Sequence, residues 1–279
     1  MNATMTNATI NPVRLEDVLV VKLGGGAGLD MARCLQDVVT LAQQRPLVLL
    51  HGISDAVNRL CAERGLEVRT IVSPNGHESR YTDPATRALY VEAVERVNSE
   101  LCATLNAHGV RAVGVHNALR GERKGAIRGM VNGRVLLIRD DYSGSITGVD
   151  ADAILRVLSE GDVPIVSPMA WSDADGYLNV DGDRASASVA SAIGASELVI
   201  LSNVRGLYRQ YPDESSLVAC VPQAQLEQAL AWAQGRMKRK VLGAQEALRG
   251  GVRRVIIADG RADAPLLGAL HGVGTRFEA

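Results

Sequence analysis

Short apolar runs alternate along the chain with longer stretches in which apolar residues recur every three or four positions. The short runs predict strands at residues 18–22, 47–51, 112–115, 163–168, 198–202 and 254–258. The longer stretches predict helices at residues 31–44, 55–64, 84–108, 151–160, 183–193, 223–232 and 240–249. Residues 127–138 predict a hairpin that turns at Asn132-Gly133. Strands that alternate with helices indicate an α/β fold whose mostly parallel sheet is covered on both faces.

The composition narrows the class of protein. With 279 residues, of which 47% are hydrophobic, the chain can form one large α/β domain or two joined lobes. The 30 basic and 31 acidic residues nearly cancel, which excludes a general electrostatic affinity for nucleic acid or an anionic membrane. No apolar run approaches the roughly 18 residues of a membrane-spanning helix, and residues 1–12 contain no apolar signal core. We therefore expect a cytoplasmic protein that acts on small molecules.

The cysteines and histidines predict no metal centre. The four cysteines lie far apart without CxxC spacing, and the five histidines form no HxxxH pair. We therefore assign no side chain as a metal ligand and expect reduced thiols.

Two glycine-rich turns between a strand and a helix are candidates for phosphate binding. The first is KLGGG, in which Lys22 ends a strand and Gly24, Gly25 and Gly26 follow. Glycines let backbone N–H groups approach phosphate oxygens, and a lysine adds a full positive charge. The second is HGIS at residues 51–54. Such turns also occur in α/β proteins for steric reasons alone, and Ser54 could simply cap a helix.

Two polar strings in the second half of the chain also suggest chemistry. The string NVDGDR at residues 179–184 opens a helix with two aspartates, one more than capping requires. The string GRMKRK at residues 235–240 puts a cationic run at the start of a helix, where positive charge is unfavourable unless an anion binds there. A solvated basic face is the alternative for this second string.

In this order, these motifs resemble the amino acid kinase family, whose members phosphorylate carboxylates, carbamate or phosphates with ATP. The resemblance runs from about residue 18 to the C-terminus. It implies a three-layer αβα sandwich with a central mostly parallel sheet and two lobes. Residues 1–184 would form the amino-acid substrate lobe, which also provides a homodimer interface, and residues 185–279 would form the ATP-binding lobe. The strings SRYTD (79–83), DYSG (141–144), NVDGDRA (179–185) and GRMKRKV (235–241) are similar to a subgroup within the family. That subgroup acts on 2-aminoadipate or glutamate carried on a LysW-type amino-group carrier protein.

The resemblance implies a role for each matching position. Lys22 and Lys240 would stabilise the phosphoryl groups and Asp183 would orient both lysines, as the catalytic set. The substrate would be bound by Gly24, Gly25, Gly52, Ile53, Arg80 and Asn179, with the glycines as backbone donors and Arg80 and Asn179 on the α-side carboxylate and acylated nitrogen. ATP would be bound by Ser202, Asn203, Gly206, Leu207, Met237 and Lys238. The cofactor would be ATP with Mg²⁺, the metal being held mainly by the nucleotide.

The resemblance leaves alternatives open. Ile53 stands where the family usually has a glycine of an HGGG motif, Gly26 stands where a serine is common, and Asn203 stands where an aspartate is common. The chain could therefore also be an acetylglutamate kinase acting on the free N-acetylated amino acid, or a catalytically weakened nucleotide-binding regulatory homologue. The residues do not decide between aminoadipate and glutamate.

A basic segment favours the carrier-dependent alternative. Residues 120–139 hold Arg120, Arg123, Lys124, Arg128, Arg134 and Arg139 against Glu122 alone. In a nearly neutral chain, such a segment suits docking of a small acidic carrier protein. A solvated hairpin is the alternative here.

Overall fold

The computed structural model describes residues 17–73, 78–131 and 133–278. Its central sheet has eight strands in the order β14-β16-β15-β13-β1-β2-β10-β5. Their bounds are β1 Leu19–Leu23, β2 Leu47–His51, β5 Ala112–Val115, β10 Val163–Val166, β13 Glu197–Ser202, β14 Cys220–Pro222, β15 Arg254–Asp259 and β16 Thr275–Glu278. Neighbouring strands pair in parallel except β15 and β16, which are antiparallel. The polar N-terminal segment and Asn132 of the expected turn lie outside the described residues.

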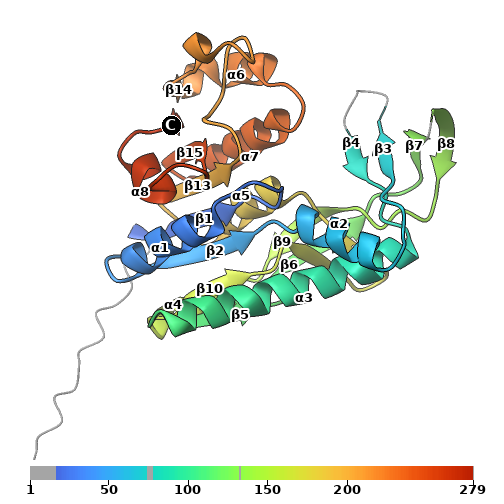
Figure 1. Cartoon of the computed structure of the whole chain (residues 1–279), viewed down its shortest axis with the longest axis horizontal. Helices are drawn as coiled ribbons and strands as arrows, with labels where there is room; N and C mark the ends of the chain where they lie inside the picture. Colours follow the sequence, from blue (N-terminus) through green and yellow to red (C-terminus); the bar gives the residue numbers. More distant parts are fainter. Residues whose placement is uncertain (1–16, 74–77, 132, 279) are drawn as a thin grey trace, which may run out of the picture.

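Helices cover both faces of this sheet (Figure 1). One face packs against α1 (Met31–Ala42), α3 (Pro84–Ala107) and α8 (Pro265–Leu270). The other packs against α4 (Ala151–Ser159), α5 (Gly182–Ala192), α6 (Leu226–Trp232) and α7 (Met237–Arg249). A further helix, α2 (Ser54–Glu63), packs on the first half of α3. The three-layer αβα sandwich expected from the sequence is confirmed.

The alternation of side chains along each strand explains the two cores. In β1, Val20 faces the α4–α7 layer, whereas Val21 faces the α1, α3 and α8 layer. In β13, Leu198 and Val199 divide in the same way. Because successive residues of a strand point to opposite faces, a strand that is covered on both sides must be apolar throughout. That requirement makes these strands recognisable in the sequence.

Two smaller sheets of four strands each accompany the central sheet. One has the order β12-β11-β6-β9, and the other has the order β4-β3-β7-β8. Their bounds are β3 Thr70–Val72, β4 Glu78–Arg80, β6 Leu119–Arg123, β7 Ile127–Val131, β8 Arg134–Ile138, β9 Gly144–Val149, β11 Met169–Ser172 and β12 Gly176–Asn179. The expected hairpin is present as β7 and β8, with Ile127 opposite Ile138. The sheet that contains it projects from one end of the body (Figure 1).

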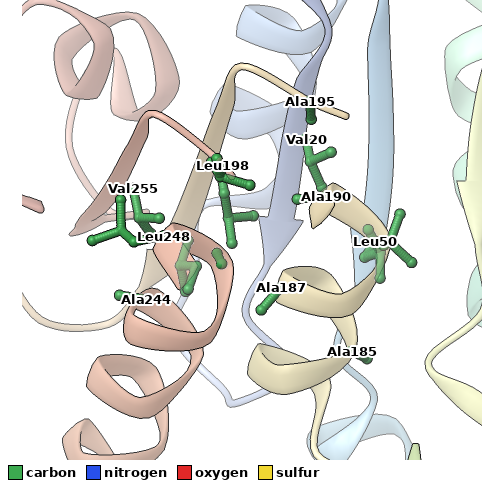
Figure 2. Packing of buried hydrophobic residues seen from close by; sticks show 14 of the residues in the cluster. Val20, Leu50, Ala185, Ala187, Ala190, Ala195, Leu198, Ala244, Leu248 and Val255 are labelled. Carbon is green, nitrogen blue, oxygen red and sulfur yellow. The ribbon is translucent and has the colours of Figure 1, made fainter. Parts of the chain in front are cut away.

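Small residues line the contact between helices α5 and α7 and let the two helices pack closely. Ala187 and Ala190 on α5 and Ala244 on α7 belong to one buried cluster with Leu248 (Figure 2). At Gly243, an added side-chain carbon would lie 3.0 Å from the carbonyl oxygen of Asp183. Small residues therefore let the start of α7 approach the start of α5, where polar side chains of the two helices meet.

The sequence misplaced the start of α7. The apolar pattern predicted a helix over residues 240–249, whereas α7 spans Met237–Arg249, so the cationic run occupies its first turn. The expected lobe boundary after residue 184 falls inside α5, and the division into two lobes stays a prediction. Among the residues described, no helix has the length and apolar character needed to span a membrane.

Candidate functional site

The two glycine-rich turns meet at the carboxyl end of the central sheet. Strands β1 and β2 are parallel neighbours with Leu23 opposite His51, so the turns that follow them start side by side. A side-chain carbon on Gly25 would overlap the backbone nitrogen of Ile53, and one on Gly52 would overlap the backbone of Gly25. Only glycine at both positions permits this backbone contact. The carboxyl ends of parallel strands are where α/β proteins bind ligands.

Hydrogen bonds fix the two turns against each other. The Gly52 N–H donates to the Leu23 carbonyl at 2.8 Å, and the Asp55 N–H donates to the Gly25 carbonyl at 2.7 Å. The expectation that Gly52 supplies a backbone donor to a ligand is therefore not met here, because this N–H is already used within the fold. Gly24 also has a close neighbour, since a side-chain carbon added there would lie 2.9 Å from the Leu201 carbonyl oxygen.

Ile53 has a structural explanation. It precedes α2 with φ −134° and is 6% exposed, packed in the cluster between α2 and α3. A negative φ of this size is open to any residue, so the position does not require glycine.

Asp183 lies between two lysines from different elements. Its Oδ1 is 2.9 Å from Nζ of Lys22 on β1, and its Oδ2 is 3.0 Å from Nζ of Lys240 on α7. The three side chains are between 7% and 11% exposed. Burial alone would raise the pKa of Asp183, but the attraction of both lysines holds it well below the usual range of a carboxyl group. Burial lowers the pKa of Lys240, and Asp183 opposes that shift. The structure thus joins all three residues expected to form the catalytic set.

The local sequence explains why Asp183 is free to contact the lysines. The carboxylate of Asp181 caps α5 by accepting from the N–H groups of Asp183 and Arg184, both at 3.0 Å. With capping done by Asp181, the second aspartate of the string points to Lys22 and Lys240. The same Asp181 carboxylate lies 3.5 Å from Nη1 of Arg239, which also donates to the Glu78 carbonyl of β4. Helix α7 is thereby connected to the small β3–β4 sheet.

Arg80 approaches the site from β4. Its Nη2 donates to the Asn58 Oδ1 at 2.6 Å and to the Ser54 carbonyl at 3.1 Å, so α2 holds the guanidinium in place. Its Nη1 is buried without a hydrogen-bond acceptor among the described residues. Burial lowers the pKa of Arg80, with a smaller contribution from the positive charge of Arg236. A buried donor of a cation without an acceptor is costly and suits an anionic ligand. Asn58, which orients Arg80, carries no signal in the sequence.

Asn179 and Asp141 both form hydrogen bonds with Thr82, two residues after Arg80. Asn179 ends β12, and its side-chain amide donates to Oγ1 of Thr82 at 2.8 Å. The buried Asp141 accepts from the N–H of Thr82 at 2.8 Å and from the N–H and hydroxyl of Ser143. Asp141 therefore ties together the segments at Thr82 and Ser143, a role that the DYSG string does not reveal in the sequence.

The residues expected to bind ATP lie at the end of β13, in the segment that follows it and in the first turn of α7. Ser202 ends β13 and is buried, and the exposed Asn203 follows it. The N–H of Leu207 donates to Oγ1 of Thr275 at 2.8 Å, and an added carbon on Gly206 would overlap that same hydroxyl. Met237 and Lys238, which make up the rest of this set, lie in the first turn of α7 and are partly exposed. These residues occupy the carboxyl end of β13 and the start of α7, on the lobe expected to bind the nucleotide.

One residue of the expected basic surface is a structural residue instead. Arg123 donates to the carbonyls of Asp141 and Arg139, forms an ion pair of 3.2 Å with Asp175 and stacks on the ring of Tyr142. Its side chain is therefore occupied within the fold, and the expectation that it serves a partner is wrong. Exposed basic side chains remain at Arg120, Lys124, Arg128, Arg134 and Arg139.

The chain is similar in sequence to a known protein family and to proteins of known name. Residues 17–259 match the amino acid kinase family. A LysW-aminoadipate kinase from Deinococcus radiodurans is 39% identical over 269 residues, which cover 94% of this chain and 92% of that protein. A LysW-aminoadipate kinase from Thermus thermophilus is 39% identical over 92% of this chain and 99% of its own.

Solved structures share the fold. An N-acetylglutamate synthase from Neisseria gonorrhoeae, complexed with coenzyme A and N-acetyl-glutamate, matches with a TM-score of 0.78 and 28% identity over 94% of this chain. The match covers 59% of the synthase, so this chain spans about three-fifths of that protein. A carbamate kinase from Giardia matches with a TM-score of 0.67 and 15% identity, over 94% of this chain and 99% of that one. The family match over residues 17–259 and the 39% identity to full-length relatives show that the chain belongs to the amino acid kinase family.

Proposed function

We propose that this chain transfers the γ-phosphoryl group of ATP to the side-chain carboxylate of an amino acid whose amino group is bound to a carrier protein. The favoured amino acid is 2-aminoadipate or glutamate, and the product is an acyl phosphate for lysine- or arginine-type biosynthesis. The observation that carries the proposal is the contact of both oxygens of Asp183 with Lys22 and Lys240 beside the paired glycine turns.

The chemistry needs charge and position rather than a general base. A side-chain carboxylate has a pKa of about 4 and is already ionised at neutral pH, so it attacks the γ-phosphorus directly. A bond forms between the carboxylate oxygen and phosphorus, the bond to the β,γ-bridging oxygen breaks, and ADP leaves with the electron pair. Lys22 from β1 and Lys240 from α7 would stabilise the charge on the transferring group from two sides. Asp183 would hold both ammonium groups in place despite their mutual repulsion.

The donors at the carboxyl end of the sheet suit ATP. The two lysines, with Lys238 at the start of α7, give the site an excess of positive charge that complements a polyphosphate. Mg²⁺ would be held mainly by the phosphates of the nucleotide, and it would offset their charge when bound. Ser202, Asn203, Gly206 and Leu207 would border the nucleotide along the segment that follows β13.

The amino-acid side of the site is supported by Arg80 and Asn179. The unpartnered Nη1 of Arg80 would donate to the substrate's α-side carboxylate, and Asn58 would keep the guanidinium oriented. Asn179 would contact the acylated nitrogen. The names of the Deinococcus radiodurans and Thermus thermophilus relatives support aminoadipate on a LysW carrier as the substrate form.

The projecting hairpin supports docking of an acidic carrier. Lys124, Arg128 and Arg134 are exposed on or beside β7 and β8, and we call these three residues the basic hairpin surface. The same hairpin exposes apolar side chains at Met130, Val135, Leu136 and Leu137, which are between 44% and 69% exposed. Apolar side chains rimmed by charges of one sign suit a protein partner of opposite charge. A homodimer through α3 is a further part of the proposal.

Trapping the product with hydroxylamine tests the proposed function. With MgATP and carrier-bound aminoadipate, the wild-type chain should form a hydroxamate, and Lys22→Ala should lower kcat roughly 10²–10³-fold. In Lys22→Ala the buried carboxylate of Asp183 would keep only Lys240 as a partner, which costs stability, so the folding of this variant must be confirmed by circular dichroism. If the wild type binds MgATP but forms no hydroxamate with any acylated substrate, the chain is a regulatory nucleotide-binding homologue. Hydroxamate formed with acetylglutamate but not with carrier-bound substrate would make it an acetylglutamate kinase.

A further inference from the structure

Arg236 reaches across the site to the first glycine turn. It immediately precedes α7, and its Nη1 lies 3.9 Å from the position that a side-chain carbon on Gly26 would take. Apart from Gly26 and the residues on either side of it, no other heavy atom among the described residues comes within 4 Å of that position. Because Gly26 has no side chain, the guanidinium of Arg236 has room to lie beside the first glycine turn.

Among the described residues the side chain of Arg236 has no partner, unlike those of Arg239 and Lys240 in the same cationic run. Arg239 contacts Asp181 and the Glu78 carbonyl, and Lys240 contacts Asp183. In the part of the chain that the structure describes, no hydrogen bond or ion pair involves the side chain of Arg236. A cation at the start of a helix is unfavourable unless an anion offsets it. Asp181 and Asp183 offset the charges of Arg239 and Lys240, but no acidic side chain among the described residues pairs with Arg236.

The surrounding charges indicate where that anion would bind. Arg236 and Lys240 are four residues apart at the start of α7, so their side chains emerge from the same side of the helix. Lys240 extends to Asp183, and Arg236 extends to Gly26, on the turn that begins at Gly24, two residues after Lys22. The positive charge of Arg236 also contributes to the lowered pKa of Arg80, although burial is the larger cause. The anion would therefore lie between the glycine turn, Lys22 and Lys240.

We propose that Arg236 is a further catalytic residue, whose guanidinium contacts the γ-phosphoryl group of ATP while that group is transferred. This inference rests on the proposed function. The guanidinium keeps all its protons and forms no covalent bond. In the transition state, negative charge spreads over the three equatorial oxygens of the phosphoryl group, and a planar guanidinium can donate to two of them at once. Lys22 and Lys240 offer point charges and cannot form this paired contact.

The test compares three variants of the full chain in the hydroxylamine assay with MgATP and carrier-bound aminoadipate. Arg236→Ala should lower kcat roughly 10²–10³-fold, because one preorganised donor to the transition state is lost. Its KM for either substrate should change by less than about fivefold, since the contact forms mainly during transfer. Arg236→Lys should recover only part of the rate. Arg249→Ala, at the exposed far end of the same helix where it pairs with Glu227, is the control and should keep the wild-type rate.

Binding of a transition-state mimic gives an independent measurement. The affinity of wild type for MgADP with aluminium fluoride and substrate should fall sharply in Arg236→Ala, whereas the affinity for MgATP alone should stay near that of wild type. An unchanged kcat in a folded Arg236→Ala variant would overturn the inference and leave the proposed function standing. A raised KM with an unchanged kcat would also overturn it, because Arg236 would then only bind a ground state. An inactive wild type would overturn the proposed function, and this inference with it.

Discussion

Nζ of Lys22 lies 2.9 Å from Oδ1 of Asp183, and this ion pair joins strand β1 to helix α5 directly beneath the two glycine turns. Because the other oxygen of Asp183 contacts Lys240, one carboxylate sets the separation of two ammonium groups. Two buried ammonium groups without that carboxylate would repel each other strongly. The geometry of the proposed phosphoryl site therefore depends on a residue that need not touch the reacting atoms.

Asp183→Asn tests that dependence. The change keeps the shape of the side chain but removes the charge, so we expect kcat to fall by about 10²-fold or more. The free energy of unfolding should fall as well. Asp181→Asn is the comparison, because asparagine caps a helix about as well as aspartate does and the change removes only the longer contact of 3.5 Å with Arg239. Equal activities of Asp183→Asn and wild type in the hydroxylamine assay would contradict the proposed arrangement.

The pH dependence of stability gives Asp183→Asn a second readout. The folded-state pKa of Asp183 lies below its unfolded value, which is near 4. The stability that this carboxylate contributes is therefore fully present above about pH 4 and is lost as the pH falls further. The difference in unfolding free energy between wild type and Asp183→Asn should accordingly be largest near neutral pH and should shrink in acid. A difference that stays constant down to about pH 3 would contradict this.

The lowered pKa of Lys240 predicts an alkaline limit to catalysis. Burial stabilises the neutral amine, so the ammonium should lose its proton below the ordinary lysine value of about 10.4. We expect kcat to fall as the pH rises through this lowered pKa. In Lys240→Arg the charge persists to higher pH, so the alkaline limb of any remaining activity should move upward. Coincident limbs for the two proteins would show that another group controls the profile.

Deprotonation of Lys240 should raise the free energy of unfolding while it lowers kcat. In the pH range between the lowered folded pKa of Lys240 and the ordinary unfolded value, the unfolded chain binds more protons. Stability from this group therefore rises with pH in the window where kcat falls. Denaturant unfolding of wild type and Lys240→Arg across that window measures the difference.

Six of the eight strands of the central sheet could be predicted because burial on both faces leaves a continuous apolar run, whereas the partly exposed β14 and β16 have no such run and were not expected. Strand β1 is buried at every position, as is β2, and both were expected from their apolar runs. The strands of the smaller sheets were mostly missed, since β6 alternates buried and exposed residues and has Gly121 at its centre. Short, half-exposed strands of this kind are hard to distinguish from loops. The hairpin of β7 and β8 was found because of its turn residues rather than its apolar pattern.

The candidate site could be predicted only in part. Resemblance placed Lys22, Asp183 and Lys240 in one set, although 57 residues separate Asp183 from Lys240 along the chain. Contacts of that kind depend on tertiary packing, here on the close approach of α5 and α7 at Gly243. The start of α7 was misplaced for the same reason, because contacts with Asp181 and Asp183 override the unfavourable placement of cations at a helix start. Asn58 acts through Arg80 alone, and nothing in its local sequence indicates that.

Ile53→Gly tests whether the departure from the family's glycine motif weakens catalysis. Ile53 is nearly fully buried between α2 and α3 at a backbone conformation that does not need glycine. Removing its side chain should lower the unfolding free energy by about 2–5 kcal/mol. The hydroxylamine assay should show no gain in kcat, since the close approach of the two turns occurs at Gly25 and Gly52. A marked rise in kcat would instead support a weakened homologue.

Charge reversal on the basic hairpin surface tests whether the substrate is bound to a carrier. Lys124→Glu combined with Arg128→Glu removes two exposed positive charges that make no ion pair among the described residues. Against an acidic carrier, the double variant should raise KM roughly 10-fold or more with little change in kcat. The KM for a small acylated analogue should not change, because the analogue would contact only Arg80 and Asn179 in the pocket.

Two controls make this prediction specific. Arg156→Glu on α4 reverses an exposed charge away from the hairpin and should leave both KM values near those of wild type. Arg123 must be left unchanged, because its contacts with Asp175 and Tyr142 would confuse loss of docking with loss of structure. If docking is electrostatic, the KM for carrier-bound substrate in wild type should also rise with salt, and this rise should be smaller in the double variant. Equal kcat/KM for the two substrate forms, or no effect of the reversal, would favour acetylglutamate as the substrate, since a free small molecule has no use for charges outside the pocket.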